Sequence, residues 1–256
     1  MIYITGDCHC DFQRFTKKRL SWLPYAITEK DYVIVCGDFG LLWAKDAELE
    51  YNCKFLTSRP FTILWVSGNH ENYDMIKEYP IEMWNGGKVR HIVKDKIILL
   101  ERGQVFNIES KTFFTMGGAS SHDVQGGILD KDSPTYDEDR RKAIKSELPY
   151  RVKHYSWWEE ELPTEEELEE GRKNLQSVDY KVDYVIAHCM ASRMQDALEE
   201  YYKFPFKHFT ADILTDFFDE LEDKLEFKKF YCGHYHEELM LDEKHEILYK
   251  AIKPLD

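Results

Sequence analysis

The segment Ile2-Tyr3-Ile4-Thr5-Gly6-Asp7-Cys8-His9 joins a short apolar run directly to an aspartate and a histidine two positions apart. An apolar run of this length bounded by glycine is typical of a buried strand. Apolar runs followed by similar side chains return at Cys36-Gly37-Asp38, Ser67-Gly68-Asn69-His70, Ala187-His188 and Gly233-His234-Tyr235-His236. Carboxylate, imidazole and amide oxygen are donors that suit divalent zinc, manganese, iron or nickel. The sequence therefore predicts a metal centre whose ligands are delivered by several strands.

The first third of the chain alternates strand and helix signals. Strands are expected at Ile2–Thr5, Tyr32–Cys36 and Phe61–Val66, and helices at Phe12–Trp22 and Asp46–Thr57. This rhythm is typical of parallel β-α-β units, which need both faces of a sheet covered. Because chemistry in open α/β sheets gathers at the carboxyl ends of strands, the first three motifs are expected at one edge of a sheet.

The pattern changes to short strands between residues 88 and 118. Four are expected, at Val89–Val93, Ile97–Leu100, Gln104–Ile108 and Thr112–Met116, and turn-like residues between them favour an antiparallel meander. A polar loop and a charged, weakly periodic stretch follow. We interpret residues 119–155 as an irregular insert or flap. Residues 1–256 are read as a single domain, because the sequence shows no repeat or low-complexity linker.

Helix and strand signals alternate again in the second half. Capping-box patterns at Ser156–Glu159 and Thr164–Glu167 predict helix starts, the second leading into a helix that ends near Leu175. The remaining expected elements are strands at Val182–Ala187, Lys228–Cys232, Glu238–Leu241 and Ile247–Ile252 and helices at Arg193–Tyr202 and Ala211–Lys224.

Composition limits the possible partners. The chain has 256 residues, 43% of them hydrophobic, and a formal net charge of -14, which fits a packed globular protein rather than a disordered one. An acidic surface repels nucleic-acid backbones, so no extended nucleic-acid surface is expected. Two bound divalent cations would offset about four negative charges inside one cleft. A phosphoester substrate is therefore compatible with the charge.

Several features favour a cytoplasmic protein. The N-terminus lacks the regions of a signal peptide, and no apolar run reaches the roughly 18 residues needed to cross a membrane. The six cysteines (8, 10, 36, 53, 189 and 232) mostly lie beside the ligand motifs, where disulfides would distort the site. We expect reduced thiols. The oligomeric state is left open.

The spacing within the motifs suits metal binding. In an extended segment, residues two apart project to the same side, so Asp7 and His9 can hold one ion together. A carboxylate directly after glycine, as at Asp38, can approach two ions, because glycine lets the backbone turn sharply. Asn69 would supply a neutral oxygen and leave His70 free for proton transfer. Each motif taken alone is also explained by an ordinary turn or helix cap.

The ordered set Gly-Asp-x-His, Gly-Asp, Gly-Asn-His-Glu, His and Gly-His-x-His, spanning residues 6 to 236, resembles the calcineurin-like metallophosphoesterase superfamily, in particular small bacterial or phage-type members. The resemblance implies a four-layer αββα sandwich of two mixed sheets flanked by helices. It implies two divalent ions (manganese, iron, zinc or nickel, with manganese favoured). By this resemblance one ion is held by Asp7, His9, Asp38 and His236, and the other by Asp38, Asn69, His188 and His234. Asp38 is then the bridge, and His70 contacts the scissile phosphate and protonates the leaving group.

Two positions depart from the family pattern. Cys10 stands where the first motif usually has glycine, and Leu41 stands where the second motif usually has a second aspartate. That aspartate normally orients the histidine equivalent to His70, so its replacement affects the support of His70 rather than metal binding. Glu71 and Asp74 are candidates to take over this support.

The expected function is metal-dependent hydrolysis of phosphoester bonds by a hydroxide shared between the two ions. No arginine lies in a ligand motif, which favours phosphodiester or nucleotide-type substrates. The alternatives are a phosphomonoesterase acting on a protein or small molecule, a non-catalytic binding scaffold with the same fold, and a structural zinc protein, although the last would favour thiolate-rich sites. Candidate substrate contacts are His122, Ser120 and Arg90.

Overall fold

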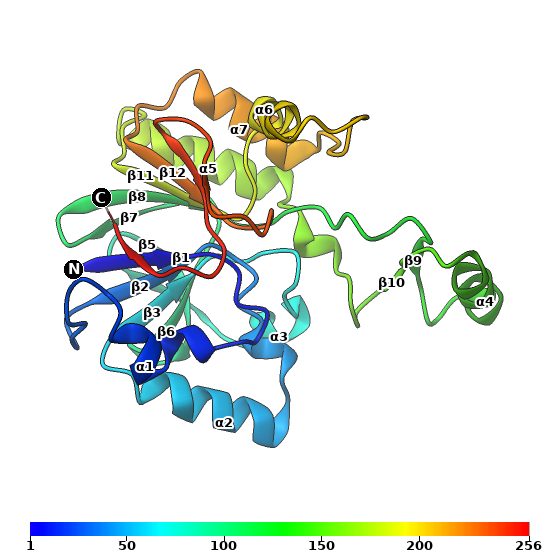
Figure 1. The fold of residues 1–256 in the computed structure, drawn as a ribbon, viewed down its shortest axis with the longest axis horizontal. Helices are drawn as coiled ribbons and strands as arrows, with labels where there is room; N and C mark the ends of the chain where they lie inside the picture. The colour runs from blue at the N-terminus through cyan, green and yellow to red at the C-terminus, as the bar shows by residue number, and fades with distance from the viewer. Residues whose placement is uncertain (256) are drawn as a thin grey trace.

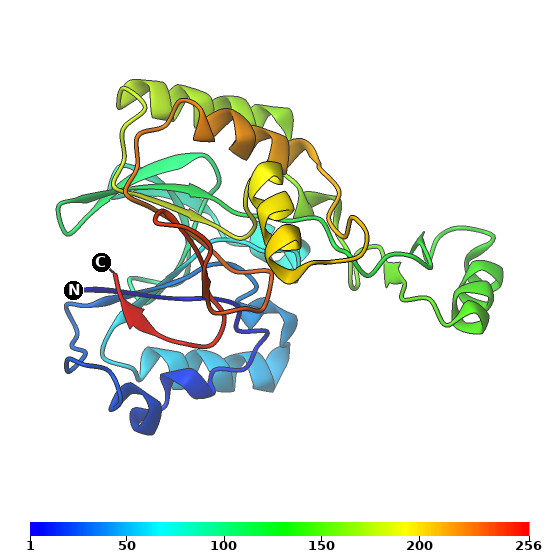
Figure 2. The same cartoon turned by 45° about the horizontal axis from the view of Figure 1, so that its top comes forward.

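Two mixed β-sheets lie face to face in the computed structural model, which describes residues 1–255, and helices cover both outer faces (Figures 1 and 2). The expected four-layer αββα sandwich is confirmed. The seven-stranded sheet has the order β15-β1-β2-β3-β6-β5-β4 and the six-stranded sheet the order β13-β14-β12-β11-β8-β7.

The first sheet comprises β1 (Ile2–Thr5), β2 (Tyr32–Val35), β3 (Thr62–Trp65), β4 (Ile81–Trp84), β5 (Gly87–Val93), β6 (Ile97–Leu100) and β15 (Lys253–Pro254). The second comprises β7 (Gln104–Ile108), β8 (Lys111–Met116), β11 (Tyr184–Ala187), β12 (Lys229–Cys232), β13 (Leu239–Met240) and β14 (His245–Ile247). Strands β1, β2, β3 and β6 are mutually parallel, as are β8, β11, β12 and β14. Their carboxyl ends therefore gather at one edge of each sheet.

Helices pack on the outer face of each sheet. Beside the first sheet lie η1 (Gln13–Phe15), α1 (Lys17–Leu20), η2 (Leu41–Trp43), α2 (Asp46–Thr57) and α3 (Tyr73–Lys77). Beside the second lie α5 (Glu165–Ser177), α6 (Ser192–Tyr202) and α7 (Ile213–Glu222), preceded by η3 (Glu159–Glu161). No helix among the described residues is long and apolar enough to cross a membrane.

The alternation of side chains along each strand creates three hydrophobic cores. In β3, Ile63 and Trp65 face the helices, whereas Leu64 and the following Val66 face the other sheet. All four side chains are buried, as expected for a strand covered on both faces. This layering rigidly fixes the strand ends that carry the ligand motifs.

The prediction of one antiparallel meander over the four short strands is wrong, because the chain passes from the first sheet to the second between β6 and β7. Strand β6 pairs with β5 and β3, but β7 pairs with β8 in the other sheet. Residues 101–103 make the crossing, with Arg102 buried and Gly103 at a φ of +68°. Strand β4, which the sequence did not suggest, adds a half-exposed edge to the first sheet.

The predictions for helix caps and for the C-terminal strands are confirmed only in part. The capping box of Thr164 is confirmed, since its hydroxyl accepts from the Glu167 N–H and the Glu167 carboxylate accepts from the Thr164 N–H. The one at Ser156 is wrong, because the Ser156 hydroxyl instead accepts from the Val152 N–H at 2.9 Å. A strand over Ile247–Ile252 is also wrong: β14 ends at Ile247, and β15 then joins the first sheet.

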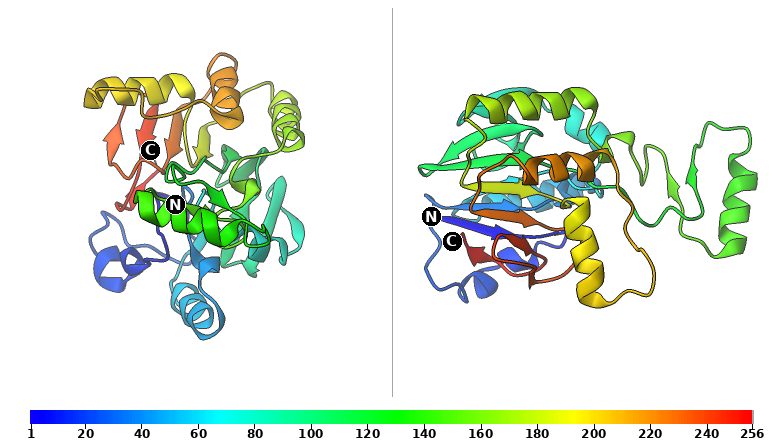
Figure 3. Two further views of the ribbon diagram at one scale, coloured as in Figure 1. Left: turned by 90° about the vertical axis from the view of Figure 1, so that its right-hand side faces the viewer. Right: turned by 90° about the horizontal axis from the view of Figure 1, so that it is seen from above.

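An arm of residues 128–152 projects from the body at the side where the parallel strands end (Figures 1 and 3). It holds β9 (Ile128–Leu129), α4 (Tyr136–Ser146) and β10 (Arg151–Val152), with β9 and β10 paired in parallel. Within α4 only Ala143 is buried, which explains why its sequence lacks a clear apolar period. The organisation as one domain with an insert at 119–155 stays a prediction.

Candidate metal centre

Four predicted ligands meet between the ends of β1, β2 and β12. The Nε2 atom of His236 lies 3.1 Å from Oδ2 of Asp7 and 2.9 Å from Nε2 of His9. The same His9 nitrogen lies 3.7 Å from Oδ2 of Asp38. We call Asp7, His9, Asp38 and His236 the first ligand group.

The other predicted ligands surround the second oxygen of Asp38. The Nε2 atom of His188 lies 3.3 Å from Oδ1 of Asp38 and 3.1 Å from Oδ1 of Asn69. The Nδ1 atom of His234 lies 3.1 Å from the same Asn69 oxygen. Asp38, Asn69, His188 and His234 form the second ligand group. Asp38 thus presents one carboxylate oxygen to each group, the geometry of a bridging ligand.

The donor atoms fit divalent metal ions. Two ligand atoms each about 2.1 Å from one ion, at right angles to each other, lie about 3.0 Å apart, which is close to the separations above. The Nδ1–H of His188 donates to the Cys36 carbonyl at 2.7 Å, so Nε2 is the ring atom that faces the oxygens of Asp38 and Asn69 and would bind an ion. Atoms that converge in this way need a positive charge between them, which a proton or a metal ion can supply.

The electrostatics of the centre show the same need. Burial alone would raise the pKa of Asp7, but the imidazoles of His188, His236 and His9 hold it well below its usual range. Burial opposes ionisation of Asp38 as well, yet His188 lowers its pKa to about 2. Burial also disfavours charge on His188, but Asp38 and Asp7 raise the pKa of His188 to about 9. The two carboxylates therefore stay ionised and attract cations.

Several ligands occupy strained backbone positions. His9, Asp38, His234 and His236 have φ values of 46°, 46°, 68° and 55°, in the left-handed region that non-glycine residues rarely adopt. Strain of this kind costs about 1–3 kcal/mol per residue and clusters at functional sites. Cys10, at the position where the family has glycine, is also left-handed, with a φ of 62°.

Two glycines allow the motifs to approach each other. A Cβ atom on Gly68 would overlap the Asp38 carboxylate, and one on Gly233 would overlap the Asp7 carboxylate. Gly68 precedes the ligand Asn69 and Gly233 precedes the ligand His234. Each must be glycine because the carboxylate of another ligand occupies the space that a side chain would fill. Arg14, which the sequence did not single out, fastens this region by donating to the Gly6 carbonyl at 3.0 Å and the Tyr249 carbonyl at 2.6 Å.

His70 is held through its backbone. Its N–H donates to Oδ1 of Asp38 at 2.7 Å, and its carbonyl accepts from the Trp43 indole. Leu41 is fully buried in the core between the first sheet and its helices, so it takes no part. Burial lowers the pKa of His70, an effect that Asp38 partly offsets.

Neither residue expected to replace the missing aspartate supports the His70 ring. The Glu71 carboxylate accepts from the backbone N–H groups of Phe39 and Gly40, at 2.8 and 3.3 Å, and so holds the loop after Asp38. Asp74 accepts from the Trp158 indole at 2.7 Å. That expectation is corrected.

Arg151 approaches the nitrogen atoms of the His70 ring. Its Nη2 atom lies 3.4 and 3.3 Å from the two ring nitrogens, while its Nε donates to Asp123 at 2.7 Å. Arg151 lies on β10 in the arm, 81 positions from His70, within a charged stretch that gave no motif signal. Only the fold could reveal this contact.

The three candidate substrate contacts have different surroundings. The Nε2 atom of His122 lies 2.9 Å from Nε2 of His234, so His122 orients a ligand. The Ser120 hydroxyl donates to Asp212, the residue that caps α7, at 2.7 Å. The expectation that Arg90 contacts substrate is corrected. Its guanidinium pairs with Glu101 at 2.6 Å and donates to the Tyr79 carbonyl, and the structure does not bring it to the metal centre.

Comparisons with known proteins identify relatives at the level of a family. A model of the calcineurin-like phosphoesterase family matches residues 1–238. Among solved structures, the chain is similar to phosphopantetheinyl hydrolase (PptH) from Mycobacterium tuberculosis, with 14% sequence identity and a TM-score of 0.42 over 97% of this chain and 87% of that chain. A search of curated proteins finds no match.

Proposed function

The chain belongs to the calcineurin-like phosphoesterase family and is a metal-dependent phosphoric ester hydrolase, and we propose that its centre hydrolyses nucleotide-type phosphoesters or phosphodiesters with two metal ions. The observation that carries this proposal is the Asp38 carboxylate, which presents one oxygen to each ligand group. Bound there, two ions would activate a shared water and stabilise charge on the phosphoryl oxygens. Manganese is our first choice of metal, because carboxylate and amide oxygens suit it and the bridging ligand Asp38 is a carboxylate.

Each ligand group has residues that fix its geometry. In the first group, the stacking of Tyr249 on His236, with ring centroids 4.7 Å apart, holds that imidazole in place. In the second, His188 is fixed by Cys36 and His234 by His122. Such outer contacts orient metal ligands and raise their affinity. The centre is thus pre-organised by the chain itself.

His70 and Arg151 are assigned to the reacting phosphoryl group. In hydrolysis the water oxygen bonds to phosphorus, the bond from phosphorus to the leaving oxygen breaks, and that oxygen takes a proton. A bound phosphoryl group places negative charge beside His70, which favours the protonated ring despite its burial. His70 then donates the proton to the leaving oxygen. The Arg151 guanidinium beside it binds the phosphoryl oxygens through charged hydrogen bonds.

Arg151 also favours the second candidate, a phosphomonoesterase. The preference for diesters rests on the lack of an arginine in the ligand motifs, yet the fold places Arg151 next to His70. A guanidinium matches a dianionic terminal phosphate better than the single charge of a diester. A non-catalytic scaffold is disfavoured, because every expected ligand position is filled.

The cellular setting is proposed to be the cytoplasm. All six cysteines are free, and four of them (8, 36, 189 and 232) are buried beside the ligand motifs. Free thiols of this kind fit a reducing compartment.

A substrate panel in the presence of Mn²⁺ tests the function. It comprises p-nitrophenyl phosphate, its bis ester, cyclic nucleotides and dinucleoside polyphosphates. We expect turnover of at least one class and loss of that turnover on chelation of the metal. Faster hydrolysis of plain monoesters than of every diester would establish the second candidate. No turnover with manganese, iron, zinc or nickel would contradict both.

A further inference from the structure

A cleft of about 350 Å³ opens beside the second ligand group. Its volume lies within the range of about 300–1,000 Å³ found for small-molecule sites. Aromatic side chains dominate its lining, which comes from the end of α6, the segment that follows it and the Gly233–His236 motif. The residues that matter below are Tyr202, Phe204, His208, Phe209, Tyr235 and Glu237.

Two rings of the cleft are partly exposed. Tyr202 and Phe204 are stacked, with centroids 5.7 Å apart and an interplanar angle of 19°. Their exposed fractions are 38% and 40%, large for aromatic residues of a folded chain. Phe209 and Tyr235 meet edge to face at 5.3 Å and form the base of the cleft, with Phe209 buried and Tyr235 partly buried. The cleft therefore offers flat apolar surfaces that a ligand from solvent can reach.

The charge of the cleft disfavours a second phosphate. Glu237 supplies a carboxylate, and neither lysine nor arginine occurs among the described residues that line it. A carboxylate without cations repels anions and accepts hydrogen bonds from N–H and O–H groups. The cleft thus suits an uncharged planar group that carries such donors. The Tyr202 hydroxyl already donates to Glu237, and an alkyl chain would offer no donor to the remaining lone pairs of that carboxylate.

The cleft is continuous with the metal centre. His234 lines it and also places its Nδ1 atom 3.1 Å from Asn69 in the second ligand group. His122 lies on the same wall, 2.9 Å from His234, and packs edge to face on Phe209 at 5.4 Å. A group bound in the cleft is therefore a direct neighbour of a phosphorus atom bound at the centre.

We propose that this cleft binds the nucleobase of the substrate, so that the phosphoester is one of a nucleoside. The proposal rests on the proposed function and narrows its substrate class. A nucleobase is planar, uncharged and rich in N–H donors. Its ring stacks on Phe204 and Tyr202, and its donors, or the ribose hydroxyls, reach Glu237.

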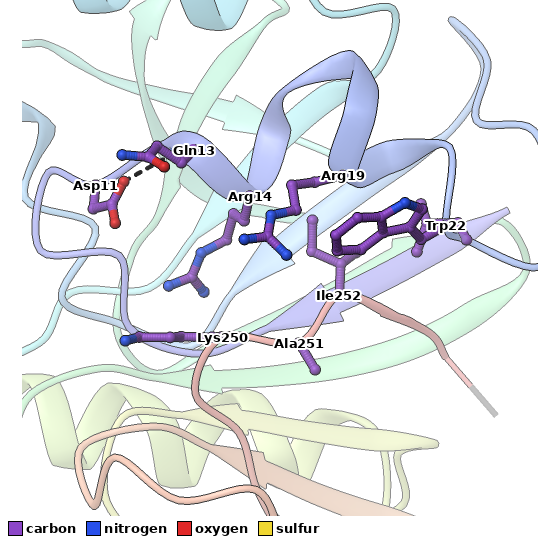
Figure 4. A pocket seen from close by; sticks show the side chains of 9 residues that line it. Asp11, Gln13, Arg14, Arg19, Trp22, Lys250, Ala251 and Ile252 are labelled. Carbon is purple, nitrogen blue, oxygen red and sulfur yellow. Dashed lines mark hydrogen bonds between the residues drawn. The ribbon is translucent and has the colours of Figure 1, made fainter.

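A second cavity, of about 490 Å³, lies beside the first motif and is lined by Arg14, Arg19, Trp22 and Lys250 (Figure 4). Its cations are partly engaged already. Arg14 donates to backbone carbonyls, and the Arg19 guanidinium lies over the Trp22 ring, 4.5 Å from the centroid. An incoming base would compete with Arg19 for that ring, which makes the aromatic cleft the better site for a base.

Direct titration of unphosphorylated nucleosides tests the cleft independently of turnover. Adenosine, guanosine, cytidine and uridine are titrated into the metal-loaded protein by calorimetry, with ribose as the ligand that lacks a base. The lining variant is Phe204→Ala. The matched control is Phe206→Ala, which removes a ring from the same segment that is 70% exposed and outside the cleft. Tyr202→Ala is the second lining variant, and circular dichroism checks that each variant is folded.

We expect at least one nucleoside to bind more tightly than ribose. Phe204→Ala should weaken that binding roughly 5- to 150-fold, the range that corresponds to loss of one base–aromatic stack. Phe206→Ala should leave it within twofold of the wild type. Equal binding of ribose and nucleosides, or unchanged nucleoside binding in both lining variants, would overturn the proposal. N-acetyl-tyrosine amide is titrated as a peptide-like aromatic ligand, and tighter binding of it than of every nucleoside would also overturn the proposal.

The same samples separate this inference from the proposed function. Turnover of the phosphoester panel without nucleoside binding would contradict the nucleobase cleft alone. Nucleoside binding without turnover of any phosphoester would contradict the hydrolase alone.

Discussion

Replacement of Arg151 by glutamine tests the contact that the sequence did not predict. The Arg151 side chain is only 15% exposed, and its Nη2 atom lies within 3.4 Å of both ring nitrogens of His70. Its Nε and Nη2 atoms are held by Asp123, so the guanidinium is fixed in position before substrate binds. Glutamine keeps much of the length but removes the charge and the fork of donors.

The expected decrease in kcat/KM for Arg151→Gln follows from the hydrogen bonds that are lost. A hydrogen bond from a charged donor contributes about 1.5–3 kcal/mol, which corresponds to roughly a 10- to 150-fold decrease in kcat/KM. Arg151→Lys should fall between the wild type and Arg151→Gln, because lysine keeps the charge but cannot hold Asp123 and a phosphoryl oxygen together. Asp123→Asn should have a smaller effect, since it loosens the arginine without removing it.

The assay is steady-state hydrolysis of the best substrate in the panel, with the metal content of each variant measured in the same preparation. Full metal content with reduced kcat/KM is the predicted result for Arg151→Gln. If its kcat/KM stays within twofold of the wild type, Arg151 does not contact the phosphoryl group. If metal is lost with activity, the arginine supports the centre instead.

Two further predictions concern His70 and His245. His70→Asn should lower kcat by about 10²- to 10⁴-fold for an alkyl phosphate and much less for p-nitrophenyl phosphate, whose leaving group needs no proton; equal losses for the two esters would contradict a proton donor. Burial disfavours charge on His245, but Glu222 and Asp242, 2.8 and 2.9 Å away, raise its pKa. The stability from this raised pKa is present below about pH 6.5 and is lost as pH rises through the folded value. Chemical denaturation of wild type and His245→Gln should therefore differ most near pH 6 and least near pH 9, and a difference that grows with pH would contradict this account.

Local signals in the sequence were sufficient to locate the ligands. Each ligand follows an apolar run that forms a buried strand, and the carboxyl ends of parallel strands meet at one edge. The bounds of α2, β6 and β7 were predicted to the residue, because their periodicity and turn residues are local. The bridging position of Asp38 came from the resemblance, and the structure adds the two oxygens that face the two groups.

The remaining features depend on contacts between distant residues. Nothing near Gln104 signals that β7 leaves the sheet of β6, since both strands are short and apolar. The contact of His122 with His234, 112 positions away, is also not visible in the sequence, and the role of His122 as a substrate contact stays a prediction. The aromatic cleft likewise forms only when the segment after α6 folds back over the Gly233–His236 motif. Such pairings are set by tertiary packing, which no local pattern encodes.

The central claim is a dinuclear centre bridged by Asp38. Its most direct test is the metal content of wild type and Asp38→Asn, measured by mass spectrometry after loading with Mn²⁺ and gel filtration. We predict two ions per wild-type chain, fewer than one in Asp38→Asn, and a parallel loss of phosphoester hydrolysis. Two ions and full activity in Asp38→Asn, or one ion per fully active wild-type chain, would contradict the account.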